Sequence, residues 1–347
     1  MQTIATTCPF CAVGCGLRLA VEDERVTAVH PDPAHPVSRG QLCVKGWNAD
    51  RFLRDPDRLT TPLLRRDGAL MPVSWDDALA AAATALQNAQ RDGGPDAVGV
   101  VSSARATNED NFAAMKFARA VLGTNNVDHC ARVCHAPSVA GLTRTLGSGA
   151  MTNPIDDIDR TDLLLVVGSD ATENHPIIGG RMLAAAARGA GLIVVDPRRT
   201  RLAQRADLHL QLRLGTDIPL VTGMLHAIFT HGWENAEYLA RRCENDAALR
   251  AAVADTTPES AAAITGIPAA LIVEAARRYA TTPHAFLAYG IGVTQHICGT
   301  ENVIAWSNLA LATGHVGVEG AGINPLRGQN NVQGACDMGA LPDVLSG

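Results

Sequence analysis

The arrangement of apolar and polar positions along the chain changes at about residue 160. Beyond it, short stretches that are apolar almost throughout, as expected of parallel strands covered on both faces, lie at 162–168, 192–196 and 284–289. Helical periodicity predicts helices at 177–188, 218–231, 269–280 and 301–313. Strands and helices that alternate in this way predict a doubly wound α/β domain.

The first part of the chain predicts smaller units. Residues 1–57 are rich in Cys, Pro and Gly and contain β-prone stretches such as 17–21, which predicts a small β-rich module. Ser74 then begins an alanine-rich helix. A buried strand at 97–102 and a helix at 108–121 follow it, as the first part of an α/β domain. We divide the chain into four segments, the last of which starts a return to the second: 1–57, 58–133, 134–330 and 331–347.

The composition narrows the class of protein. The 347 residues have an apolar fraction of 47% and a net charge of −6, which gives no reason to expect nucleic acid or an anionic membrane as a partner. We expect no export, because no leader precedes Cys8, and no membrane span, because no eighteen consecutive residues are apolar. Nine cysteines without an evident disulfide framework are typical of a reducing, cytoplasmic compartment.

Four cysteines near the N-terminus form the most informative motif. Cys8, Cys11, Cys15 and Cys43 follow the pattern C-x2-C-x3-C-x27-C. Structural zinc sites favour two separated C-x2-C pairs, whereas three thiolates from one loop and a distant fourth suit an iron–sulfur cluster with irons at four corners. The sequence therefore predicts a cluster, with a zinc site and a set of free thiols as alternatives.

Two further segments carry candidate chemistry. Cys134 and His135 are adjacent, as a nucleophile and its base or as a soft-metal ligand and a proton acceptor would be. The alternative is a buried thiol beside a hydrogen-bonded histidine, and Cys130 fits that structural role better. Arg327, in a glycine-rich polar loop, offers a planar fork for a carboxylate. Its alternative is a solvated loop arginine.

The predicted strands of the α/β domain end in polar turns. The loop 168–174 follows one strand, Asp196 ends the next, and the turn 215–217 supplies another acid. Ligands of open parallel sheets bind at such strand ends. A plain NAD site is disfavoured because these turns lack G-x-G-x-x-G. The predicted ligand is a nucleotide, and ordinary strand-end turns are the alternative.

Together these motifs resemble the catalytic subunit of molybdenum or tungsten formate dehydrogenases, in the molybdopterin-guanine-dinucleotide oxidoreductase family. The resemblance covers the whole chain, and the string 325–339 is highly specific. Position 170 is Asp where many relatives carry Asn. Family members are roughly twice as long, so the resemblance implies a missing C-terminal half or a second chain that supplies it.

The resemblance implies a role for each motif. The four N-terminal cysteines would hold a 4Fe–4S cluster, and Lys45 would lie between that cluster and a pterin. Cys134 would bind molybdenum or tungsten, His135 would handle a proton and Arg327 would hold the substrate. The residues implied to contact a bis-molybdopterin guanine dinucleotide are Gly168, Asp170, Asn174, Asp196, Arg198, Thr200, Gly215, Asp217 and Gln329.

The activity that the resemblance implies is oxidation of formate to CO2, or the reverse reaction, with electrons passing through the cluster. An electron-transfer subunit or a ferredoxin-like protein would accept them. An assimilatory nitrate reductase is the enzymatic alternative, since it shares the cluster, the pterin and the cysteine. A truncated iron–sulfur fragment without catalysis is the alternative from another class.

Overall fold

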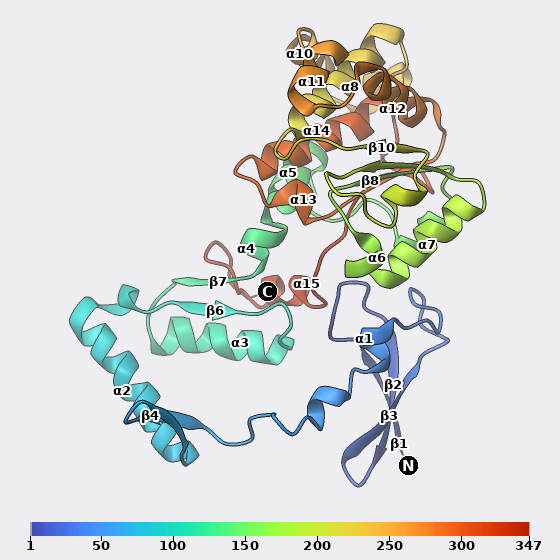
Figure 1. Cartoon of the computed structure of the whole chain (residues 1–347). Helices are drawn as coiled ribbons and strands as arrows, with labels where there is room; N and C mark the ends of the chain where they lie inside the picture. The colour runs from blue at the N-terminus through green and yellow to red at the C-terminus, as the bar shows by residue number, and fades with distance from the viewer. Residues whose placement is uncertain (1, 347) are drawn as a thin grey trace.

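The computed structural model describes residues 2–346. Its N-terminal module is a three-stranded antiparallel sheet of β1 (Gln2–Thr7), β2 (Gly16–Glu22) and β3 (Arg25–Pro31), with the short helices α1 (Val44–Trp47) and η1 (Arg51–Leu53) beside it (Figure 1). The cysteine loop joins β1 to β2, and the Cys8 N–H donates to the Cys15 carbonyl at 2.8 Å. The predicted β-rich module is therefore present.

The large domain is built on a sheet of five parallel strands in the order β10-β9-β8-β11-β12. The strands are β8 (Leu163–Val167), β9 (Gly191–Val195), β10 (Leu208–Leu210), β11 (Ala285–Tyr289) and β12 (Ile323–Pro325). The chain extends the sheet outward from β8 to β9 and β10, and then returns to the other side of β8 with β11. The switch between β8 and β11 is the point at which open α/β sheets bind ligands.

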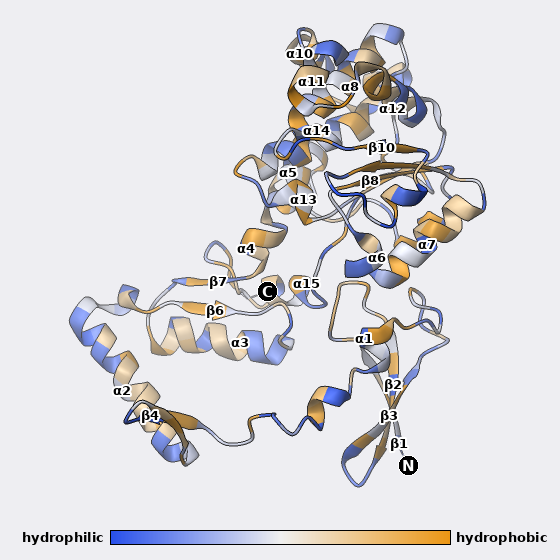
Figure 2. Cartoon of the chain, in the orientation of Figure 1, coloured by the Kyte–Doolittle hydropathy of each residue, from blue (hydrophilic) through white to orange (hydrophobic). Residues whose placement is uncertain are grey.

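Helices cover both faces of this sheet, as its uniformly apolar strands predict. Leu164 and Val166 of β8 pack toward α7 and the N-terminal module, whereas Leu163, Leu165 and Val167 pack into the core of the other face. Figure 2 shows the hydrophobic residues along β8 and α7. The fold class is thus the α/β class that the sequence predicts.

The helices of the large domain extend the predicted set. The predicted ones are α7 (Pro176–Ala187), α8 (Asp217–His231), α12 (Ala269–Thr281) and α14 (Gly299–Ala312). Others that the sequence pattern did not identify are α4 (Ala131–Cys134), α5 (Ala136–Leu146), α6 (Ala171–Asn174), α9 (Ala236–Arg242), α10 (Asp246–Val253), α11 (Pro258–Thr265) and α13 (Ile291–Thr294), with the 3-10 turns η4 (Ile155–Asp159) and η5 (Ala203–Arg205).

A smaller unit lies between the module and the large domain in sequence (Figure 1). Its elements are the hairpin β4 (Leu63–Arg66) and β5 (Ala69–Pro72), α2 (Trp75–Gly93), η2 (Pro95–Ala97), the parallel pair β6 (Val100–Ser102) and β7 (Val127–His129), α3 (Asn108–Lys116) and the π-helical turn η3 (Phe117–Val121). The Ser74 side chain caps α2 as predicted, accepting from the Asp77 N–H at 3.1 Å.

The prediction of a buried strand at 97–102 is wrong. Only Val100–Ser102 is a strand, and Val101 is 84% exposed. Val100 packs with Met115 of α3 on one side, but β6 pairs only with β7, and within residues 2–346 nothing buries the other side.

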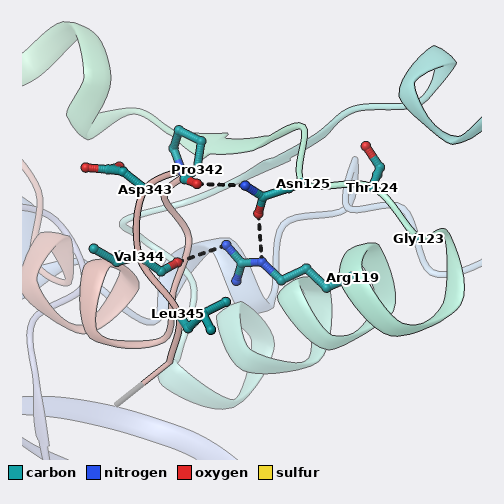
Figure 3. A pocket seen from close by; sticks show the side chains of 8 residues that line it. All are labelled: Arg119, Gly123, Thr124, Asn125, Pro342, Asp343, Val344 and Leu345. Carbon is teal, nitrogen blue, oxygen red and sulfur yellow. Dashed lines mark hydrogen bonds between the residues drawn. The ribbon is translucent and has the colours of Figure 1, made fainter.

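The C-terminal segment returns to this smaller unit. Helix α15 (Val332–Asp337) contacts α3, and Ala335 lies in the same small core as Met115. Arg119 then donates to the carbonyls of Gly339, Leu341 and Val344 at 2.9–3.0 Å, while the Asn125 amide donates to Pro342 (Figure 3). These contacts place residues 332–346 beside α3 and the loop between η3 and β7.

Within residues 2–346, no single helix has both the length and the apolar character needed to cross a bilayer. The pair α11 and α12 passes that test together but is bent by 115°.

Candidate functional site

The candidate residues of the large domain gather at one edge of the sheet. Each follows the carboxyl end of a parallel strand, because all five strands point the same way. The loop 168–174 follows β8, Asp196 follows β9, the turn 215–217 follows β10, and Arg327 follows β12. Topology therefore brings together residues that are up to about 160 positions apart in sequence.

A cavity of about 380 Å³ opens at this edge. The predicted cofactor residues that line it are Gly168, Asp170, Asn174, Asp196, Arg198, Gly215 and Asp217. Thr200 lies outside the cavity wall, where its hydroxyl accepts from the Ala203 N–H at 3.2 Å. Gln329 also lies elsewhere, with its amide oxygen 2.7 Å from the Cys130 thiol. The cavity is large enough for part of a nucleotide.

Among the cavity residues that sequence reasoning missed are Gly292 and His296. Both follow β11, as Gly168 follows β8. The signal was available, because the stretch 284–289 predicted a strand whose carboxyl end belongs to the same edge.

Gly168 is required by the backbone at the switch point. Its φ is +51°, and its carbonyl accepts from the Gly292 N–H at 3.0 Å. A Cβ atom at position 168 would lie 2.8 Å from the Gly292 Cα, which is a backbone atom that cannot turn aside. The glycines therefore allow two strand-end loops to approach closely beside the cavity.

We expect Gly168→Ala to lower the free energy of unfolding by about 2–4 kcal/mol, through the left-handed conformation and the clash with Gly292. Urea unfolding followed by circular dichroism measures the change. Gly180→Ala is the matched control: Gly180 lies within α7 with open space around its Cβ position, so alanine there should stabilise by about 0.5–1 kcal/mol. Equal effects of the two substitutions would contradict the close-approach argument.

Asp217 supplies a buried acid to the cavity. Burial raises the pKa of its carboxyl to about 6, and the nearby His296 acts in the opposite direction. Only the ionised form is purely an acceptor. Burying a carboxylate without a partner is costly, so Asp217 suits a ligand whose edge carries N–H donors. Guanine has such an edge.

A second centre forms around Cys134, at the end of α4. Its carbonyl accepts from the Thr294 hydroxyl at 2.6 Å, and its sulfur is hydrogen-bonded by the backbone N–H of Gly328. Burial raises the pKa of the thiol, whereas the Gly328 N–H and the Arg327 charge lower it. These two groups favour a thiolate, the form that binds a soft metal.

His135 is fully buried beside this thiol. Its Nδ1 lies 2.8 Å from the Ser138 hydroxyl, to which the Tyr289 hydroxyl donates at 2.9 Å, and its Nε2 lies 3.2 Å from the Leu326 carbonyl. Since a carbonyl only accepts, Nε2 carries the hydrogen. Burial, with the Arg327 charge, lowers the pKa of the ring to about 4, so the ring is neutral. The sequence analysis did not identify Ser138 and Tyr289, which orient it.

Arg327 is half-buried, and one of its guanidinium nitrogens is bonded within the protein. Its Nη2 donates to the Gly149 carbonyl at 2.9 Å. A guanidinium has five N–H donors in a plane, so the others are available for a bidentate carboxylate. The adjacent Gly328 N–H contacts the Cys134 sulfur, which places this fork beside the thiol.

The four N-terminal thiols interact with one another: Cys8, Cys11 and Cys15 lie in the cysteine loop, and Cys43 directly precedes α1. Burial, followed by the neighbouring Cys8, Cys11 and Cys43, raises the pKa of Cys15 to about 12. Burial raises the pKa of the Cys8 and Cys11 thiols as well, while backbone N–H groups and the Lys45 charge act in the opposite direction. Such an environment accommodates thiolates only when a cationic group offsets their mutual repulsion.

The number and type of these donors suit an iron–sulfur cluster. In the described part of the chain no three His, Cys, Asp or Glu side chains are grouped for one metal ion, which would require sulfur atoms about 2.3 Å from a common centre. All four thiols nevertheless interact electrostatically. An iron–sulfur cluster takes one thiolate at each of four separated irons, so this donor set fits it.

The chain belongs to the molybdopterin oxidoreductase family. Residues 58–346 match that family, and residues 1–55 match its Fe4S4 domain. These matches confirm the predicted fold class and the predicted cofactor classes, a 4Fe–4S cluster and a molybdenum or tungsten pterin. The individual site residues stay predictions.

Particular relatives are formate dehydrogenases. The F420-dependent formate dehydrogenase subunit alpha of Methanocaldococcus jannaschii is 45% identical over 346 residues, which cover 100% of this chain and 51% of that protein. Formate dehydrogenase H of Escherichia coli is 44% identical and matches 100% of this chain and 49% of its own length. The solved structure of acetylene hydratase from Pelobacter acetylenicus is 26% identical with a TM-score of 0.79, over 91% of this chain and 44% of that one. The chain therefore spans about half the length of these relatives.

Proposed function

We propose that this chain is the N-terminal half of a formate dehydrogenase catalytic subunit, which converts HCOO⁻ to CO2, a proton and two electrons or runs the reverse reaction. The observation that carries the proposal is the short segment after β12. Arg327 presents a carboxylate fork, and the next residue donates its N–H to the Cys134 sulfur. The identity to formate dehydrogenases over the whole chain supports the same substrate.

Each residue then has a defined task. Arg327 holds the formate carboxylate and orients the C–H bond. Cys134 ligates the metal, and the bound molybdenum or tungsten pterin supplies the two-electron acceptor. His135 relays the proton at Nδ1, the nitrogen beside the Ser138 hydroxyl, and does not keep it, because burial disfavours the charged ring. Asp217 and the other lining residues of the 380 Å³ cavity hold the guanine dinucleotide of a pterin.

Lys45 and the four N-terminal cysteines form the electron exit. The Lys45 charge acts on Cys8 and Cys11 of the cysteine loop and also on His175, which bonds the Arg327 carbonyl, and this supports a place for Lys45 on the electron path. A positive charge there stabilises the reduced, more negative cluster. The final acceptor is an electron-transfer subunit or a ferredoxin-like protein.

We also propose that further polypeptide, in the same chain or a second one, covers α2. No residue of α2 is buried, and Trp75 and Leu79 are 67% and 60% exposed. Relatives contain about as much chain again.

The proposal is tested by metal analysis and turnover of the complete, anaerobically purified enzyme. We expect about four irons and one molybdenum or tungsten per chain, formate-dependent reduction of a viologen dye, and no nitrate-dependent oxidation of the reduced dye. Nitrate turnover without formate turnover would make the enzyme a nitrate reductase. Iron with neither metal and no turnover would favour an electron-transfer fragment.

A further inference from the structure

His175 has one satisfied and one unsatisfied ring nitrogen. It precedes α7, its side chain is 4% exposed, and its Nε2 lies 2.6 Å from the Arg327 carbonyl. The carbonyl only accepts, so Nε2 carries the hydrogen. Burial and the Lys45 charge lower the pKa of the ring, which keeps it neutral. Nδ1 is therefore a bare acceptor.

That acceptor is buried and has no hydrogen-bond partner among residues 2–346. Buried polar atoms in native proteins are nearly always paired, and an orphan needs an explanation. The explanation lies in the surroundings of the ring.

His175 lines a separate cavity of about 210 Å³. Its walls include Ala12, from the cysteine loop, and Arg327, from the segment after β12. Met151, Ile178 and Leu326 make most of the remaining surface apolar. The cavity thus borders both the cysteine loop and the segment 325–328, which carries Arg327 and which we call the substrate segment. A flat, apolar-faced ring with N–H groups at its edge suits such a space.

We infer that His175 Nδ1 accepts a hydrogen bond from an N–H group of a pterin ring that lies between the cysteine loop and Arg327. His175 is then a pterin-binding residue on the electron path. Through Nε2 it also positions the Arg327 backbone. His135 bonds the preceding carbonyl, that of Leu326, in the same way. Two buried histidines therefore donate to consecutive carbonyls of the substrate segment. The inference rests on the pterin of the proposed function but not on formate as substrate.

Two substitutions separate the two nitrogens of His175. His175→Gln places an amide N–H₂ near the Nε2 position, so it keeps a donor for the Arg327 carbonyl and lacks the acceptor at Nδ1. His175→Asn places an amide oxygen near Nδ1 and loses the donor. His315→Gln is the matched control, because His315 is also buried and bonds the Tyr279 carbonyl through Nε2 at 2.9 Å, away from the cavity.

The measurement is the rate at which the complete enzyme releases its pterin on dilution, followed by the fluorescence of the freed, oxidised pterin, with iron per chain as the check on folding. His175→Gln should release pterin roughly 5- to 150-fold faster than the native enzyme, because the ring N–H loses its partner. His175→Asn and His315→Gln should release it at the native rate, and His175→Asn should raise the KM for formate.

Pterin release from His175→Gln at the native rate would overturn the inference. That result is the one expected if Nδ1 binds only a water molecule. Equally fast release from His175→Asn would also overturn it, because the effect would then belong to the Arg327 bond. Release needs no substrate, so an error in the substrate alone leaves the result unchanged. A native enzyme that yields no pterin overturns the inference and the proposed function together.

Discussion

Arg327→Ala is expected to lower kcat/KM for formate by roughly 10²–10⁴-fold, while iron and molybdenum or tungsten stay bound. The substitution removes two charge-assisted hydrogen bonds to the carboxylate, worth about 1.5–3 kcal/mol each. Formate offers few other atoms to hold, so little can compensate. Dye reduction measures the loss, and metal analysis of the same sample shows that the centre persists.

Two controls separate a lost clamp from general damage. Arg327→Lys keeps a point charge without the planar fork, and its activity should fall between those of the native enzyme and the alanine variant. Arg65→Ala removes an arginine that likewise donates to a backbone carbonyl, that of Gly68 in the β4–β5 hairpin, and should leave turnover unchanged. Undiminished formate oxidation by Arg327→Ala would mean that the carboxylate is held elsewhere.

Cys134→Ala is expected to abolish turnover with the iron content intact. The loss should exceed the roughly 10- to 100-fold effect typical of an outer-shell partner, because the thiolate would ligate the metal directly. The two groups that act on this sulfur, Gly328 N–H and Arg327, lie on the substrate segment rather than on the cysteine loop. Turnover and iron per chain, measured together, test the assignment.

Cys8→Ala is the reciprocal variant. It should strip iron, because the cluster loses one of four thiolates and the remaining three stay crowded and buried. Loss of iron from Cys134→Ala, or retention of four irons by Cys8→Ala, would reverse the assignment of the two thiols.

Local patterns predicted three of the five strands of the large domain, β8, β9 and β11, and missed β10 and β12, which have only three residues each. β8, β9 and β11 are buried on both faces, and such strands must be apolar at nearly every position. The helices α9, α10 and α11 were missed because they are short, at seven or eight residues each, and short helices carry a weak periodic signal. The prediction that β6 is buried was wrong for another reason. Whether a strand is covered depends on the elements that pack against it, which the strand's own sequence does not specify.

The candidate site divides in the same way. Cys8, Cys11 and Cys15 share one loop, so their spacing alone predicts a common ligand. His175 directly follows the predicted strand-end loop 168–174, yet nothing local distinguishes it from an ordinary histidine before a helix. Its significance comes from the Arg327 carbonyl, 152 residues away, and from an acceptor left bare inside a cavity.

Side-chain types and their close spacing are enough to predict the candidate chemistry: four thiols for a cluster, a cysteine and histidine pair, an arginine fork and acids at strand ends. Local sequence suffices for this prediction, because ligand and charge preferences are properties of the groups themselves. Which of these groups meet follows only from the packing of the fold. Five parallel strands bring their carboxyl ends to one edge of the sheet. The segment after β12 therefore reaches Cys134 through Gly328. Its Leu326 and Arg327 carbonyls are bonded by His135 and His175. Contacts over such separations depend on the packing of the whole sheet, which no local pattern encodes.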